Sequence, residues 1–300
     1  LGTHIRISKR MLKSRVFIRS YILNMLPEAV WLAEDWNMLF GDGNGENLLG
    51  ITNHTGVLPV ESIIKDTIIK GEAGSVKSVE SHNGGKDTIV EFTKPYDLML
   101  NGMVITFANA AVVTDLNKAN PIIKMNDRQI LLKGVAFAGE ETAIANMTFT
   151  VNNSFFQSIE APNSEDVIKT AFAVMTYAQY YPNAITLNPS DVNAMESEKD
   201  TTGRNLGIIK VVNGVKHIAN RPIVESTGML PGKYFIGDMH MGASIVDYTN
   251  LALEWAEDVE TKLCNEVVLI ASEEVIFPVY NPWAFAYGDL AELKEAITKK

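Results

Sequence analysis

The feature of this sequence that most constrains its fold is a long amphipathic stretch between residues 15 and 39. Its apolar side chains recur at spacings of three and four residues, which is typical of one face of a helix. They are Phe17, Ile18, Tyr21, Ile22, Met25, Ala29, Val30, Ala33 and Trp36. Pro27 has no N–H to donate, so the helix must either kink there or restart with Pro27 in its first turn. The pattern predicts a long rod that ends at Phe40, with Gly41 as the residue after its C-cap.

A glycine-rich loop, residues 41–50, follows the rod. A dinucleotide-binding fingerprint would need a third glycine where Glu46 or Leu48 stands. A phosphate-binding P-loop would need Gly-Lys followed by Ser or Thr, which this loop lacks. An EF-hand that began at Asp42 would need glycine at its sixth position, where Asn47 stands. The loop is therefore predicted to be a tight polar connection that re-enters the fold.

The segment before the rod is basic. Residues 1–19 contain no acidic side chain, and they carry Arg6, Lys9, Arg10, Lys13, Arg15 and Arg19. Residues 4–8 alternate in polarity with a period of two, which predicts the end of a strand. Two interpretations stay open: a charged edge strand that resists aggregation, or a basic contact with an acidic partner such as another copy of this chain. The chain starts with Leu1 and no signal-peptide core follows, so we expect it to begin inside a longer gene product.

The composition of the chain excludes several classes of protein. A length of 300 residues favours two domains, and 46% hydrophobic with 21% charged residues excludes wholesale disorder. The net charge of −10 excludes a protein that coats DNA or an anionic membrane with its whole surface. No apolar run approaches the roughly 18 residues of a membrane span. Cys264 is the only cysteine, which excludes an intrachain disulfide, and its apolar neighbours predict a buried, inert thiol.

The middle and the end of the chain differ in their predicted secondary structure. Between about residues 58 and 160, strand-like stretches separated by turn signals predict a β-rich module inserted into the surrounding domain. From residue 163 the helical pattern returns, with Ser164 as the expected N-cap of a helix that runs to Tyr180. The elements expected after it are a strand at 184–187, a short helix at 188–198, short strands between 207 and 250, and an amphipathic tail at 289–300.

No catalytic or metal-binding constellation can be assembled from these residues. The histidines lack the spacing of a zinc-binding helix, and none pairs with Cys264 in a recognisable signature. They are His4, His54, His82, His217 and His240. Glu273 and Glu274 are adjacent, so in a strand their side chains point to opposite faces and do not form a catalytic pair. We therefore expect no enzyme activity, no cofactor and no metal.

A series of short motifs, taken in order, is more informative than any single one. They are the glycine-rich loop at 41–50, Ile-Thr-Leu-Asn-Pro-Ser-Asp at 185–191, Arg-Pro-Ile-Val at 221–224, Met-Leu-Pro-Gly at 229–232, Phe-Ile-Gly-Asp at 235–238 and Val-Tyr-Asn-Pro-Trp-Ala-Phe at 279–285. This series resembles the phage capsid family, the major capsid proteins of tailed phages with the Hong Kong 97-type fold. The resemblance covers residues 15–57 and about 160–287.

The resemblance implies an α+β fold in four segments. Residues 1–57 would hold the end of the E-loop strand, the long spine helix and a peripheral-domain loop. Residues 58–160, which lie outside the family pattern, would form an inserted all-β domain. Residues 161–245 would form the axial domain, and residues 246–300 would return to the peripheral domain and end in the C-terminal tail.

The resemblance also implies where copies of the chain meet. The loop would contact neighbouring capsomers and the basic segment would face acidic surfaces. The expected assembly interface is Arg6, Lys9, Arg10, Gly41, Asp42, Gly43, Asn44, Gly45 and Glu46. Some family members form a lysine–asparagine crosslink with the help of a glutamate. Asn265 and Glu273 lie near the expected places here, but the lysine would lie upstream of Leu1, so no crosslink is predicted.

The implied function is that of a structural subunit of a phage or prophage capsid. Hexamers and pentamers of the chain would enclose the genome without sequence-specific DNA binding or membrane contact, in a virion assembled in the host bacterial cytoplasm. Scaffold, portal or decoration proteins would be further partners. Two alternatives stay open: an encapsulin-like shell around a cargo enzyme, and a ligand-binding module that uses the β insertion. Without the N-terminal arm and most of the E-loop, residues 1–300 alone are expected not to close into shells.

Overall fold

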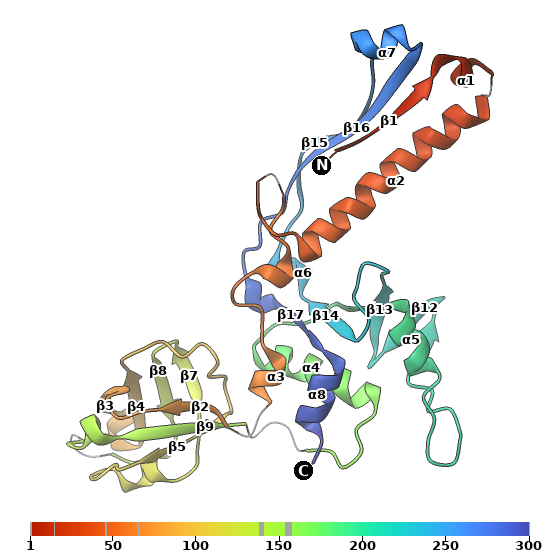
Figure 1. The fold of residues 1–300 in the computed structure, drawn as a ribbon. Helices are drawn as coiled ribbons and strands as arrows, with labels where there is room; N and C mark the ends of the chain where they lie inside the picture. Colours follow the sequence, from red (N-terminus) through yellow and green to blue (C-terminus); the bar gives the residue numbers. More distant parts are fainter. Residues whose placement is uncertain are drawn as a thin grey trace. The chain divides into compact units, whose positions relative to one another are not determined.

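The computed structural model describes residues 2–14, 16–45, 47–64, 67–137, 141–153 and 158–299 (Figure 1). The fold is α+β, as the sequence predicted, and its backbone contacts divide it into two compact units. The first unit comprises residues 1–57 and 238–285, and the second comprises residues 58–237 and 286–300. Among the described residues, no helix is both long enough and apolar enough to cross a membrane.

The first unit is built on a three-stranded antiparallel sheet with the order β1-β16-β15. These strands are β1 (Gly2–Ser8), β16 (Glu266–Ile276) and β15 (Val246–Ala256). The helices of this unit are α1 (Lys9–Ser14), α2 (Val16–Phe40), α6 (Met239–Gly242) and α7 (Val259–Leu263), with single 3-10 turns at Ile51–Asn53 and Pro282–Ala284. The strand predicted at the start of the chain is therefore confirmed as β1.

The predicted rod is confirmed as α2, which continues through Pro27 to Phe40. Only part of the predicted apolar face, including Ile22 and Val30, is buried. The side chains that pack against the sheet are Ile22, Leu26 and Val30, which form one core with Ile7, Leu269 and Ala271. Tyr21, Met25 and Trp36 are instead 37% to 58% exposed, because α2 carries two apolar stripes and the sheet covers only one of them. The side chains of Phe17 and Ile18 lie outside the described part of the chain.

Residues 67–152 of the second unit form two four-stranded antiparallel sheets. Their orders are β2-β9-β5-β6 and β3-β4-β8-β7. The strands are β2 (Thr67–Gly71), β3 (Val76–His82), β4 (Asp87–Phe92), β5 (Val104–Ala108), β6 (Asn120–Pro121), β7 (Ile123–Asn126), β8 (Gln129–Leu132) and β9 (Thr148–Asn152). Aromatic rings fill the core between them, and the Phe92 and Phe149 ring centroids lie 4.9 Å apart.

The rest of the second unit holds a six-stranded sheet with the order β11-β12-β13-β10-β14-β17. Its strands are β11 (Lys210–Val212), β12 (Val215–Ile218), β13 (Arg221–Glu225), β10 (Ala184–Leu187), β14 (Lys233–Gly237) and β17 (Phe285–Asp289). The helices are α3 (Val60–Ile63), α4 (Ser164–Tyr177), α5 (Pro189–Glu196) and α8 (Leu290–Ile297). The predicted cap of α4 was wrong by one residue, because Asn163 rather than Ser164 accepts the N–H of Asp166.

The prediction that Cys264 is buried was also wrong. Cys264 is exposed because it follows α7 at the C-cap, before β16 enters the sheet. Its apolar neighbour Val267 is buried two residues into that strand, whereas Leu263 is exposed on α7. The apolar pattern around Cys264 thus spans a helix end and a strand start rather than one buried element.

Candidate assembly surfaces and an acidic cluster

The glycine-rich loop folds back closely on the end of α2. The N–H of Gly50 donates to the carbonyl of Gly41 at 2.9 Å, and the Nδ2 of Asn53 donates to the same carbonyl at 2.8 Å. A Cβ atom on Gly41 would lie 2.1 Å from the carbonyl oxygen of Leu48, so this position has room for glycine alone. The loop is therefore a tight polar connection, as its composition indicated.

The exposed face of this loop is organised by Asp42. Its carboxylate accepts the backbone N–H of Asn44 at 3.1 Å and the Nδ2 groups of Asn44 and Asn47 at 3.0 and 2.9 Å. These hydrogen bonds, that from Asn47 above all, lower the pKa of Asp42. Gly43 and Gly45 have positive φ angles of 68° and 65°. Glu46, the last residue of the expected interface, lies outside the described residues.

The basic residues of the expected interface lie at the other end of α2. Lys9 forms an ion pair of 2.6 Å with Glu257, and Arg6 lies 3.8 Å from Glu260. The hydrogen bond with Lys9 is the main cause of a lowered pKa at Glu257. Arg10 is exposed and helps to line a hollow of about 370 Å³ with Lys9, Lys13 and Asn265. A helix of 25 residues spans about 37 Å, so the structure does not bring the two predicted sets of residues together.

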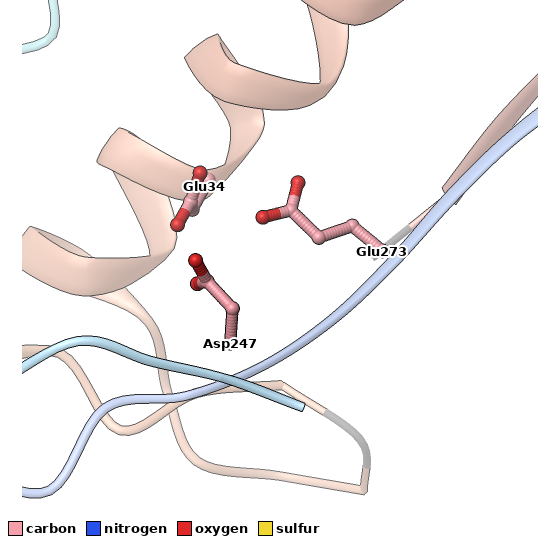
Figure 2. Close-up of side chains that lie close together, drawn as sticks. All are labelled: Glu34, Asp247 and Glu273. Atoms are coloured by element: carbon pink, nitrogen blue, oxygen red, sulfur yellow. The ribbon is translucent and has the colours of Figure 1, made fainter. Parts of the chain in front are cut away.

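Three carboxylates in the first unit form a cluster that the sequence did not indicate. Glu34 of α2, Asp247 of β15 and Glu273 of β16 place oxygen atoms within 4.8 Å of one another. Figure 2 shows the three carboxylates directed toward one another from separate elements. Each residue comes from a different segment and no spacing links them. Only the folded structure brings these three carboxylates together, so no sequence pattern could have identified the cluster.

Burial and the neighbouring negative charges in this cluster affect the ionisation of Glu34. Burial raises the pKa of Glu34, and the negative charges of Glu273, Asp247 and Asp35 raise it further. Glu273 is buried, whereas the neighbouring Glu274 accepts the hydroxyl of Thr249 at 3.0 Å. The two side chains therefore lie on opposite faces of β16, as their adjacency in a strand predicted. Carboxylate oxygens are ligands that hard cations prefer, but the arrangement by itself is a set of repelling acids.

Replacing Glu34 by Gln is expected to raise the midpoint of thermal unfolding near pH 7 by about 2 °C. A raised pKa means that folding favours the protonated carboxyl, so ionisation of Glu34 costs stability as the pH rises through the folded-state pKa. The gain should disappear well below the ordinary value of 4.5, where the carboxyl is protonated in both states. The exposed residue Glu28 on the same helix provides the control, as Glu28→Gln. A gain of equal size near pH 3 would contradict the explanation.

The chain is similar to known capsid proteins in sequence and in fold. The model of the phage capsid family matches residues 1–290. The capsid of an empty GTA particle, computed with C5 symmetry, matches with 16% identity and a TM-score of 0.50, over 96% of this chain and 70% of that chain. The native GTA particle gives 13% identity and a TM-score of 0.50 with the same coverage. A chain from Mycobacterium phage Adephagia shares 8% identity, with a TM-score of 0.48. No curated protein matches the sequence.

Proposed function

Because this chain belongs to the phage capsid family, as its ordered motifs predicted, we propose that its copies join into hexamers and pentamers that close as an icosahedral shell around a genome. The chain is a structural capsid subunit by its family. The observation that carries this conclusion is the family match over residues 1–290, almost the whole sequence. The likeness of the fold to the GTA capsid over 96% of the chain agrees with it.

The Hong Kong 97-type fold is the specific architecture we propose. In it, α2 is the spine helix and the sheet of β1, β16 and β15 belongs to the peripheral domain. Residues 161–245 form most of the axial domain, and residues 58–160 are an inserted all-β domain. The proposal is supported by the length of α2, which ends in a glycine-rich loop, and by the two four-stranded sheets confined to residues 67–152.

The surface of the first unit supports self-association. Monomeric soluble proteins rarely expose large contiguous apolar patches. In this unit, many large apolar side chains are exposed on α2, β15 and α7, including Tyr21, Leu32, Tyr248, Val259 and Leu263. A closed shell repeats modest contacts many times and covers such surfaces. Burial between copies therefore explains apolar positions that a solitary protein would not retain.

A closed shell implies further parts of the proposed function: its contents, its other partners and its site of assembly. The shell encloses DNA without reading its sequence, which agrees with a net charge of −10. Scaffold, portal and decoration proteins are its proposed further partners, and the host bacterial cytoplasm is its proposed site of assembly. The subunit acts through its contacts rather than through catalysis.

Electron microscopy of the complete gene product that contains this chain tests the proposal. We expect closed particles of uniform diameter in negative stain, with a matching large species in light scattering. Nucleic acid in those particles supports a capsid, whereas a packaged enzyme would instead identify a compartment shell. A monodisperse monomer or dimer at high concentration, across salt and pH, would overturn the proposal and favour a solitary binding module.

A further inference from the structure

The exposed face of α2 carries an apolar stripe. Tyr21, Met25, Leu32 and Trp36, here named the α2 stripe, follow one another at spacings of four, seven and four residues. These spacings place them on one face of the helix, about 100° around its axis from the core stripe of Ile22, Leu26 and Val30. Their side chains are 37% to 61% exposed.

One border of the α2 stripe is acidic. Glu28 lies three residues after Met25 and four before Leu32, and Asp35 lies three residues after Leu32. Residues three and four apart are neighbours on a helix surface, so both carboxylates flank the stripe. Both are exposed. The α2 stripe thus combines apolar side chains with negative charge, which fits a partner that is apolar and basic.

The far end of the same unit has the opposite character. Six of its exposed residues are here named the basic tip: Arg10, Met11 and Lys13 of α1, and Val259, Lys262 and Leu263 of α7. The backbone N–H of Lys9 donates to Asn265 at 3.0 Å, and the 2.6 Å ion pair of Lys9 with Glu257 holds the two segments together. Val259 and Leu263 are 72% and 83% exposed, although both are large and apolar.

The positive charge of the basic tip is available to a partner. The acidic residues beside it are already engaged, because Glu257 pairs with Lys9 and Glu260 lies 3.8 Å from Arg6, while Asp258 caps α7. Within the described part of the chain, no carboxylate forms an ion pair with Arg10, Lys13 or Lys262. The tip therefore presents the apolar side chains of Val259 and Leu263 together with the cations Arg10 and Lys13.

We infer that the basic tip of one copy docks on the α2 stripe of the next copy. This inference rests on the proposed function and names the contacting surfaces. Apolar side chains meet apolar side chains, and Arg10 and Lys13 meet Glu28 and Asp35. Tip against tip and stripe against stripe are both disfavoured, because each would oppose like charges. A contact between two different patches is head-to-tail, the type that closes rings.

Charge reversal in two separate chains tests the contact. Arg10→Glu with Lys13→Glu gives a chain with an acidic tip and an acidic stripe, and Glu28→Lys with Asp35→Lys gives a chain with a basic tip and a basic stripe. Each variant alone is expected to need at least about tenfold more protein to associate than the unaltered chain. Mixed together, the two variants should associate again, because every tip then finds a complementary stripe on the other chain.

Sedimentation velocity over a range of concentrations and salt measures the association. Matched controls are Lys86→Glu with Lys94→Glu, and Glu72→Lys with Asp97→Lys, which reverse exposed charges between residues 72 and 97. They should leave association unchanged. Circular dichroism checks that each variant keeps its fold, which we expect because all the altered residues are exposed.

Several outcomes would overturn the inference. If the mixture associates no better than its components, the tip and the stripe are not partners. If the stripe variant fails to associate while the tip variant behaves like the unaltered chain, another partner covers the stripe. If both variants form particles as readily as the unaltered chain, the contact is absent and the proposed shell function still stands. Failure of the unaltered gene product to associate at all counts against the shell function itself.

Discussion

Replacing Gly41 by alanine is expected to lower the free energy of unfolding by about 3 kcal/mol. The added Cβ would lie 2.1 Å from the carbonyl oxygen of Leu48 and 2.5 Å from that of Asn37. Both atoms belong to the backbone, so the clash cannot be relieved by turning a side chain. Gly50→Ala should cost a similar amount, because its Cβ would lie 2.5 Å from the backbone nitrogen of Gly41. The end of α2 and the returning segment of the loop would have to separate.

Urea unfolding followed by tryptophan fluorescence measures this effect in the right part of the molecule. The tryptophans at 31, 36, 255 and 283 all belong to the first unit. Gly45→Ala provides the control in the same loop, because no atom lies within 4 Å of its Cβ position. Its φ of 65° should cost only about 1 kcal/mol. Equal losses at positions 41 and 45 would show that positive φ, not close approach, dominates the loop.

The sequence predicted the elements of the first unit better than their packing. Apolar spacing located α2 because a long periodic helix carries its own signal, and Gly41 marked its end. The same spacing could not reveal the buried face. Apolar residues between 21 and 36 form two stripes, and only the sheet decides which one becomes core. If the stripe contact proposed above holds, Tyr21, Met25 and Trp36 of the predicted face are buried between copies rather than within one chain.

For the candidate sites too, the sequence revealed local features and missed those that depend on tertiary structure. Ordered motifs indicated the family because each lies within a short stretch of chain. The acidic cluster was missed because Glu34 is separated from Asp247 and Glu273 by most of the sequence. The exposure of Cys264 was missed because its apolar neighbours belong to two elements. Contacts that form only in the tertiary structure produce no regular residue spacing in the sequence, so sequence patterns cannot predict them.

Replacing Glu141 by Gln is expected to destabilise the β-rich part of the second unit by about 3 kcal/mol near pH 7. The buried carboxylate of Glu141 accepts the backbone N–H groups of Ala111, Val112, Val113 and Ala143 at 2.8 to 3.1 Å. Hydrogen bonds to an ionised acceptor are stronger than neutral ones. The amide NH₂ of glutamine would also point a donor at N–H groups that need an acceptor. Buried donors would then lose their partners.

The pH dependence separates this cause from a general loss of packing. Burial opposes ionisation of Glu141, yet its backbone donors hold the pKa below the ordinary value of 4.5. A depressed pKa contributes stability above the unfolded-state value, and that stability is lost as the pH falls through the folded-state value. The difference between the unaltered chain and Glu141→Gln should therefore be constant near neutral pH and shrink below about pH 4.

Amide hydrogen exchange shows which part of the second unit is destabilised by Glu141→Gln. The amides of residues 111–113 should lose protection in Glu141→Gln, because they donate directly to this carboxylate. The amides of β10 and β14 in the six-stranded sheet should keep theirs, since they bond within another sheet. Glu72→Gln, an exposed position, controls for the loss of a charge. A uniform rise in exchange across the second unit would instead mean that Glu141 supports global packing, and the charge-specific explanation would fail.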